Sequence, residues 1–237
     1  MAALPAEILE LRRQLERRFP DAQPVRYGTT GAVATGVGAL DAALPAGGLP
    51  RGRVTLWRPG GGATALLRSA TLAVVTGGER AAWVDGARVL AGPYWASGPM
   101  LFRPRPALAA ECAEELLRSG GFALVVLSGG GVGLGDGEGV RLARAAREGG
   151  AAFVAVAGGT PVSHLRVRTS FDPTGFRWRR GPFGEPGEPV ELSAVAVKVR
   201  LESMGLDRRV RFHLPVEHHD VRLCLDPGLV DRRGVGR

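Results

Sequence analysis

The stretch Thr35–Pro59, which reads TGVGALDAALPAGGLPRGRVTLWRP, decides the fold of this chain. Its end, Arg53–Trp57, predicts a strand, and the glycine turn Pro59–Gly62 follows at once. A run with helical periodicity over about Ala63–Val75 comes next. A strand, a glycine-rich turn and a helix in this order form the repeating unit of a parallel sheet that is covered by helices.

The same alternation continues towards the C-terminus. Further strands are predicted over Arg80–Asp85, Pro99–Arg103, Phe122–Leu127 and Ala152–Val156, and helices over Ala107–Arg118 and Val140–Arg147. The first of these helices has a predicted apolar side made of Leu108, Cys112, Leu116 and Leu117. Four strands without intervening helices follow, over His164–Phe171, Gly175–Arg179, Val190–Leu201 and Arg208–Leu214. The sequence therefore predicts an α/β fold, with a mostly parallel central sheet flanked by helices and an antiparallel extension on its C-terminal side.

The composition is that of a globular protein. Of the 237 residues, 45% are hydrophobic and 23% are charged, which is enough apolar material for a core. No stretch approaches the roughly 18 to 20 uncharged apolar residues that a membrane-spanning helix needs, so no membrane partner is expected. Cys112 and Cys224 have no CxxC spacing, which argues against a disulfide framework or a zinc site and favours a reducing cytoplasm.

The chain is basic, with a formal net charge of +8. Lys198 is the only lysine among the 31 basic residues, so nearly all of the positive charge is carried by arginine. The arginines are distributed along the whole chain. Attraction to polyanions is expected, but the charge balance locates no nucleic-acid groove.

An amphipathic segment precedes the predicted sheet. Pro5 suits a first helical turn and Pro20 ends it, which predicts a helix over about residues 5–19, and residues 20–34 are typical of a linker. The helix carries one apolar stripe, formed by Leu4, Ile8, Leu11, Leu15 and Phe19. Since an isolated helix cannot bury this stripe on itself, the stripe packs either on the body of the protein or on a second molecule.

The succession of elements resembles the core of the RecA family of recombinases. The likeness is carried by four segments in the right order, namely Thr35–Pro59, Glu79–Ala96, Ala110–Ser128 and Val197–Leu214. The resemblance implies an N-terminal helix with its linker over residues 1–34, a RecA-like core over residues 35–215 and a C-terminal tail over residues 216–237.

The phosphate loop of that family is degenerate here. Such a loop needs glycines whose backbone N–H groups surround the phosphates, a lysine for the β- and γ-phosphates and a hydroxyl for magnesium. The matching residues are Pro59, Gly60, Gly61, Gly62, Ala63 and Thr64. Thr64 stands at the lysine position, and Ala65 and Leu66 stand at the hydroxyl positions. Arg68, one helical turn further, leaves open a weak anion or nucleotide contact at the helix start.

Other positions that carry chemistry in the family have also lost it. The resemblance places the water-activating glutamate among Gly86, Ala87 and Arg88, the Walker B aspartate at Leu127, just before Ser128, and the interface lysines near Leu201 and Ser203. Phosphoryl transfer depends almost entirely on positioned charge. We therefore expect no ATPase activity, no catalytic residue and no bound cofactor.

The long DNA-binding loops of the family are replaced by the glycine tract Gly129–Gly139 and by residues 158–163, which are too short to intercalate between bases. DNA contact is considered instead for Arg177, Trp178, Arg179 and Arg180, which follow Phe176 and interleave aromatic rings with arginines. A strand with Phe176 and Trp178 directed inward fits the same alternation equally well.

One cluster of metal-ligating residue types lies near the C-terminus. It consists of His213, Glu217, His218, His219 and Asp220. Adjacent histidines on an extended segment point to opposite faces, so both cannot serve one ion without a kink. No metal site is expected.

A RecA-like chain without Walker residues and without long DNA loops resembles the ImuA family. That family accompanies a Y-family-like protein and an error-prone polymerase in the damage-induced (SOS) response of translesion synthesis. The resemblance implies a non-catalytic adaptor whose partner is a Y-family-like polymerase accessory protein, RecA or both. Self-association through the N-terminal stripe is a further option. Two alternative functions stay open: an arginine-rich module that binds single-stranded DNA, and a residual nucleotide-binding ATPase or recombinase.

Overall fold

An eight-stranded mixed sheet organises the chain in the computed structural model, which describes residues 31–88, 90, 98–129, 134–159, 162–179, 191–203 and 205–216. Its strands are β3 (Val54–Arg58), β4 (Ala81–Asp85), β5 (Met100–Phe102), β6 (Leu124–Ser128), β7 (Ala152–Val156), β8 (Leu165–Arg179), β9 (Glu191–Ser203) and β10 (Leu206–Pro215). They lie in the order β10-β9-β8-β3-β7-β6-β4-β5. All pairs from β8 to β5 are parallel, and β9 and β10 join antiparallel. The prediction of an α/β fold with an antiparallel extension is confirmed.

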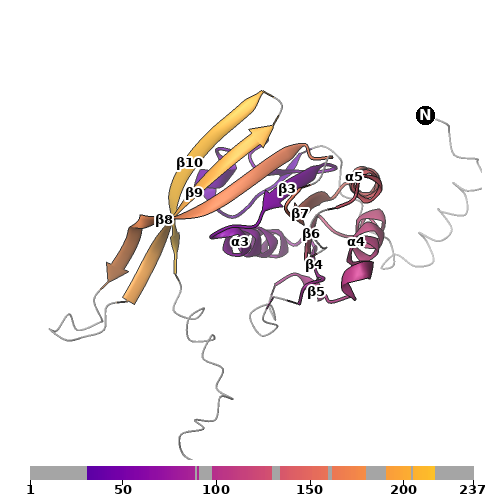
Figure 1. Ribbon diagram of the computed structural model, residues 1–237, viewed down its shortest axis with the longest axis horizontal. Coiled ribbons are helices and arrows are strands. Elements are labelled where there is room, and N and C mark those ends of the chain that lie inside the picture. Colours follow the sequence, from indigo (N-terminus) through magenta and orange to yellow (C-terminus); the bar gives the residue numbers. More distant parts are fainter. Residues whose placement is uncertain are drawn as a thin grey trace, which may run out of the picture.

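Helices cover both faces of the parallel strands. They are α2 (Gly38–Asp41), α3 (Ala63–Thr76), the 3-10 helix η3 (Pro106–Leu108), α4 (Ala109–Arg118) and α5 (Asp136–Gly149). Helix α3 lies on one side of the sheet and α4 and α5 lie on the other, while β8, β9 and β10 extend beyond the helices as a wing (Figure 1). A small sheet of β1 (Ala32–Val33) and β2 (Leu49–Pro50) lies ahead of β3. The last residues of the segment predicted as a linker therefore belong to the fold.

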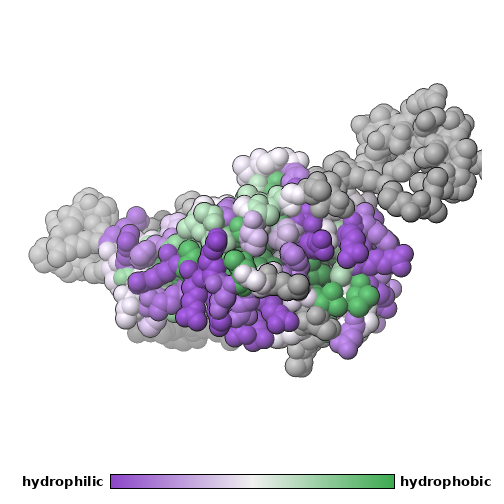
Figure 2. All heavy atoms as spheres, turned by 90° about the horizontal axis from the view of Figure 1, so that it is seen from above, coloured by the Kyte–Doolittle hydropathy of each residue, from purple (hydrophilic) through white to green (hydrophobic). Residues whose placement is uncertain are grey.

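The two faces of the sheet build two apolar cores. Trp57 and Trp83 are fully buried on the α3 face, together with Leu66 of the helix itself. Leu117 and Phe153 are buried on the face covered by α4 and α5. Because both faces are buried, β6 and β7 are almost uniformly apolar, which is why their positions could be predicted. The face shown in Figure 2, by contrast, carries a broad band of hydrophilic side chains.

Three details of the helices and strands differ from the prediction. The segment 107–118 is not one α-helix, because residues 106–108 form a 3-10 turn that rotates Leu108 outward to 47% exposure. Ala109, Ala113 and Leu117 face the core in its place. Helix α5 begins at Asp136, ahead of the predicted start, within the tract that was expected to be a glycine connection.

The third difference concerns β8. The strand runs without interruption from Leu165 to Arg179, where two strands were predicted. Its pairing with β9 changes register between Phe171 and Phe176. Between these two pairs β8 has more residues than β9, so Pro173 lies at an irregularity inside a strand rather than at its end.

The N-terminal stripe of Leu4, Ile8, Leu11, Leu15 and Phe19 lies outside the described residues, as do Arg180 and residues 217–237. Among the described helices, none combines the length and the apolar composition that crossing a membrane requires.

The close packing of α4 on α5 gives a test of the fold. A Cβ atom on Gly149 would overlap the carbonyl oxygen of Leu117, whereas a Cβ on Gly137 of the same helix would meet open space. We expect Gly149→Ala to lower the free energy of unfolding by about 1–3 kcal/mol through overpacking. We expect Gly137→Ala to raise it by roughly 0.5–1 kcal/mol, because alanine favours the helix. Urea denaturation measures both, and equal effects would contradict this packing.

Candidate functional site

A cavity of about 400 Å³ lies at the carboxyl ends of the central strands. The chain leaves β3 into α3 on one face of the sheet, whereas it leaves β6 into α5 on the opposite face. Connections that diverge in this way open a crevice, which is where open α/β sheets bind their ligands. We call this cavity the loop pocket, because the glycine loop between β3 and α3 forms one of its walls.

The loop pocket is built from uncharged residues. It is lined by Pro59, Gly60, Ala63, Thr64, Leu67, Trp83, Ala87, Leu90, Ser128, Gly129, Val156, Ala157 and Gly158. None of these described residues has an ionisable side chain that could meet a phosphate or a magnesium ion. Thr64 and Ala87, which stand where the resemblance places a lysine and a glutamate, do lie in the pocket wall.

An indole–hydroxyl pair contributes to the pocket at the end of β6. The Trp83 indole N–H donates a hydrogen bond of 2.8 Å to Ser128 Oγ, which in turn lies 3.4 Å from the carbonyl oxygen of Val84. Leu127, the predicted Walker B position, does not line the pocket but is buried in the core under α4 and α5. The hydroxyl that faces the pocket at this strand is therefore already hydrogen-bonded within the protein.

The nearby carboxylate at the end of β4 is also committed to the structure. Asp85 is fully buried, and its Oδ2 accepts a hydrogen bond of 3.0 Å from the Leu90 backbone N–H. The same oxygen lies 3.9 Å from Nε of Arg103. Asp85 is not among the residues that line the pocket. The described residues do not fit a nucleotide with its magnesium ion.

Packing against β8 and backbone conformation explain why the loop between β3 and α3 consists of glycines. A Cβ on Gly60 would overlap the backbone carbonyl oxygen of Thr169 in β8, and one on Gly61 would come within 2.6 Å of the Phe171 ring. Gly62, the N-cap residue of α3, has a φ of 87°, in the left-handed region that favours glycine. The glycines are thus required for the loop to pass close to β8, whether or not a phosphate binds.

The remaining predicted positions are distributed over other parts of the fold. Arg68 lines a separate cleft on the outer side of α3, so it does not supply a cation to the loop pocket. Leu201 is a core residue, and the Ser203 hydroxyl donates a hydrogen bond of 2.8 Å to the His164 carbonyl oxygen. In the described part of the chain, no three potential metal ligands cluster.

The aromatic and arginine residues at the end of β8 are exposed. Phe176 is 39% and Trp178 60% exposed, so the interpretation in which both rings point inward is wrong. Arg177 and Arg179 are exposed as well. The surface is available to a partner, but these residues line none of the pockets described for the molecule.

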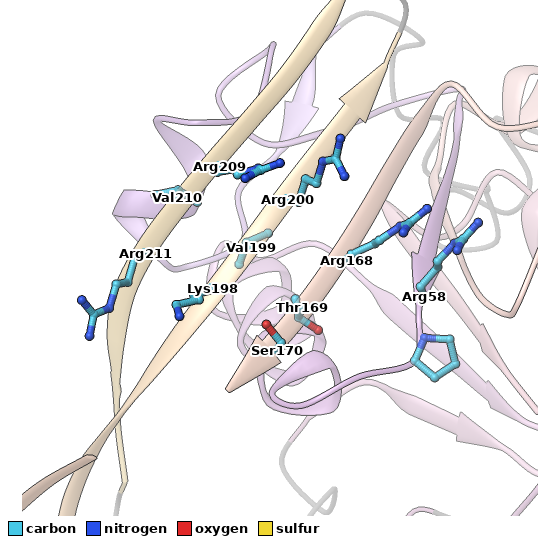
Figure 3. Close-up of a pocket in the computed structure, with 11 residues that line it drawn as sticks. Arg58, Arg168, Thr169, Ser170, Lys198, Val199, Arg200, Arg209, Val210 and Arg211 are labelled. Carbon is cyan, nitrogen blue, oxygen red and sulfur yellow. The ribbon is translucent and has the colours of Figure 1, made fainter. Parts of the chain in front are cut away.

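A larger cleft of about 750 Å³, strongly basic, lies on the wing. Its cationic lining residues are Arg58, Arg168, Lys198, Arg200, Arg209 and Arg211. Four of them face one another on adjacent strands, since Arg58 pairs in register with Arg168, Arg168 with Arg200, and Arg200 with Arg209. We call these four residues the arginine row; Figure 3 shows them side by side across β3, β8, β9 and β10.

Carboxylates border the arginine row on both sides. On one side Asp207 accepts two hydrogen bonds from Arg200, at 3.0 and 2.8 Å, and Glu202 lies 3.0 Å from the same guanidinium group. The hydrogen bonds from Arg200 hold the pKa of Asp207 below its ordinary value. On the other side the buried Asp172 lies 3.2 Å from Lys198 Nζ and 2.9 Å from Arg211 Nη2.

Sequence reasoning missed the basic cleft, although a signal was present. Each of the three wing strands alternates basic and apolar residues, in the segments Arg166–Arg168, Lys198–Arg200 and Arg209–Arg211. A period of two places such basic residues on one face of a strand. The signal was diluted because arginine is abundant along the whole chain, and the register that aligns the three segments is not visible in the sequence.

Comparison with known proteins does not identify the chain. No model of a protein family matches it, and no curated protein matches it. The resemblance to the RecA and ImuA families therefore stays a prediction made from the residues quoted above.

Asp172 gives a pH-dependent test of the wing. Hydrogen bonds from Thr174 and then Lys198 lower its pKa from 3.8 to about 2. A carboxyl group whose pKa is lower in the folded than in the unfolded chain stabilises the fold at neutral pH and loses this effect as the pH falls. We expect Asp172→Asn to destabilise the protein at pH 7, and the difference from the parent to shrink as the pH falls from 3.8 towards about 2.

Unfolding free energies measured across this range test the expectation. Thr174→Val is the companion variant, because it removes the largest cause of the lowered pKa and should move the loss of stability to higher pH. A difference between parent and Asp172→Asn that does not change with pH would show that the carboxylate charge is not involved.

Proposed function

We propose that this chain is a non-catalytic, RecA-like adaptor of the ImuA type, which assembles RecA-fold and polymerase-like partners in damage-induced translesion synthesis. The observation that carries the proposal is the uncharged lining of the loop pocket. The position of the pocket supports a common architecture with nucleotide-binding sheets, and its lining supports the loss of their chemistry.

The arrangement around β3 supports the architectural part. The strand, the glycine loop and α3 follow one another in the order that the resemblance requires, and β3 lies inside the sheet, between β7 and β8. The loop pocket lies where the connections diverge to opposite faces, which is the position of the ligand site in open α/β sheets that bind ligands.

The electrostatics support the non-catalytic part. A bound triphosphate would place several negative charges against Thr64, Ala87 and the Trp83–Ser128 pair. Buried charge that meets no opposite charge is costly, and phosphoryl transfer needs positioned cations as well. A chain that keeps the fold without these groups serves through the surfaces that it offers to other molecules.

The N-terminal stripe is the surface proposed for RecA-fold partners, or for a second copy of the chain. Burial of its five apolar side chains is worth on the order of 5–10 kcal/mol before the cost of association, which is enough for a specific contact. The C-terminal strands and tail are proposed to contact the Y-family-like polymerase accessory protein.

Addition of ATP and magnesium tests the proposal that the loop pocket neither binds nor hydrolyses a nucleotide. We expect ATP with magnesium to leave the Tm unchanged and phosphate release at background, whereas a ligand at 100 times its Kd would stabilise the fold by about 2.7 kcal/mol. The proposal fails if the Tm rises to saturation with ATP and this rise disappears in Thr64→Glu, which places a negative charge in the pocket wall.

Co-purification tests the adaptor role. We expect Leu11→Asp or Leu15→Asp to abolish binding to RecA or to the polymerase accessory protein, with the Tm nearly unchanged. Ala6→Asp is the matched control, because it adds the same charge on the opposite side of the predicted helix and should leave binding intact. Partner binding that survives both leucine substitutions would refute the docking role of the stripe.

A further inference from the structure

The arginine row is a costly arrangement in the isolated protein. Like charges directly opposite one another on neighbouring strands repel and destabilise a sheet. Here the repulsion is repeated at three successive strand pairs, from Arg58 through Arg168 and Arg200 to Arg209. With strands about 4.8 Å apart, the row spans roughly 14 Å. Such a row is stabilised when anions lie along it.

The protein itself supplies only part of the neutralising charge. The cleft has six described cationic lining residues, and the described carboxylates that contact them are Asp172, Glu202 and Asp207. Arg58 and Arg209, the two ends of the row, form no ion pair with any described residue. Among the described residues, six cationic side chains therefore face three carboxylates, and Arg209 is attracted to Asp207 only at longer range than an ion pair.

A second observation also indicates a missing acceptor. Nε of Arg58 is buried and has no hydrogen-bond partner among the described residues. Buried donors in folded proteins are nearly always paired, so an unpaired one calls for an explanation such as a ligand. Arg58 ends β3 beside Arg168, and both lie in the wall of the basic cleft (Figure 3).

We propose that the arginine row binds the phosphodiester backbone of a nucleic acid strand that runs across β3, β8, β9 and β10. A guanidinium fork donates two parallel hydrogen bonds to a phosphate, which suits arginine better than lysine for this contact. Contacts of this kind hold the strand by its phosphates and read no sequence. The site is distinct from the loop pocket and from Arg177–Arg180, and it does not depend on the adaptor role proposed above.

The shape and composition of the cleft favour a phosphodiester strand over an acidic protein or a single phosphate. Protein interfaces are centred on desolvated aromatic or apolar anchors, whereas the described lining of the cleft holds no aromatic ring, and its two valines, Val199 and Val210, are buried and half-buried. A single phosphate could engage only part of a row that is roughly 14 Å long. A chain of consecutive phosphates meets the whole row.

Fluorescence anisotropy with a labelled 20-nucleotide single strand, and with the corresponding duplex, tests the proposal on the full chain. We expect the double variant Arg168→Ala/Arg209→Ala to weaken binding at least tenfold at low salt. The slope of log K against log salt should become shallower by roughly 0.7 per lost phosphate contact for a single strand and 0.9 for a duplex. The strand form with the larger loss identifies the preferred ligand.

Two further variants separate a specific site from general charge. The double variant Arg105→Ala/Arg147→Ala removes the same charge from exposed positions outside the cleft and should change binding less than twofold. Asp207→Asn, which removes one of the two carboxylates that contact Arg200, should tighten binding severalfold. Because the row repels itself, we expect the Tm of Arg168→Ala/Arg209→Ala to be no lower than that of the parent.

Three outcomes would overturn the proposal. Equal weakening by the two double variants would mean that the +8 net charge, rather than the row, attracts the nucleic acid. Competition by polyglutamate as strong as that by the oligonucleotide, at equal charge, would identify an acidic protein as the ligand. Displacement of the strand by millimolar inorganic phosphate would identify a small-anion site. Each of these outcomes leaves the partner test with Leu11→Asp unaffected, so the two proposals can fail separately.

Discussion

The structure depends on the close approach of the glycine loop to β8. Strand β3 pairs in parallel with both β7 and β8, so it joins the helix-covered half of the sheet to the wing. The chain leaving β3 must turn into α3 directly against β8, and a side chain at Gly60 or Gly61 would overlap Thr169 or Phe171. Only a loop without side chains fits there, which fixes the position of α3 and of the pocket beside it.

This constraint shows that packing alone requires the glycines between β3 and α3, whether or not a phosphate binds there. The glycines are held by packing, whereas Thr64, Ala65 and Leu127 stand where the resemblance to the RecA family leads one to expect a lysine, a hydroxyl and a carboxylate. The Trp83–Ser128 hydrogen bond then occupies polar groups at the base of the pocket that would otherwise need water or a ligand. Glycine patterns are therefore weak evidence for nucleotide binding unless the charged residues accompany them.

The sequence predicted the position of a strand or helix well where the residues of that element alone determine it. The uniformly apolar β6 and β7 and the helix α3 were found at nearly their observed bounds, because burial on both faces leaves a local pattern. The sequence was less informative about which residues share a surface, because this depends on how several strands and helices are placed together. Leu127 and Ser128 differ by one residue, yet one lies in the core and the other in the pocket wall, since successive residues of a strand face opposite sides. The arginine row needs the register of four strands, which the sequence does not display.

The wing shows how the same alternation produces two different surfaces from one set of strands. On β8 and β9, Val167 and Val199 point into the core beside α3, while Arg168 and Arg200 point the other way. Helices α4 and α5 pack on β4, β6, β7 and β3, so the outward face beyond β3 is left to its own side chains. A solvated face needs polar residues, but neutral or mixed charges would satisfy that need without repulsion. Here the carboxylates of Asp172, Glu202 and Asp207 offset part of the repulsion, and the positive charge that they leave is concentrated on this face of the wing.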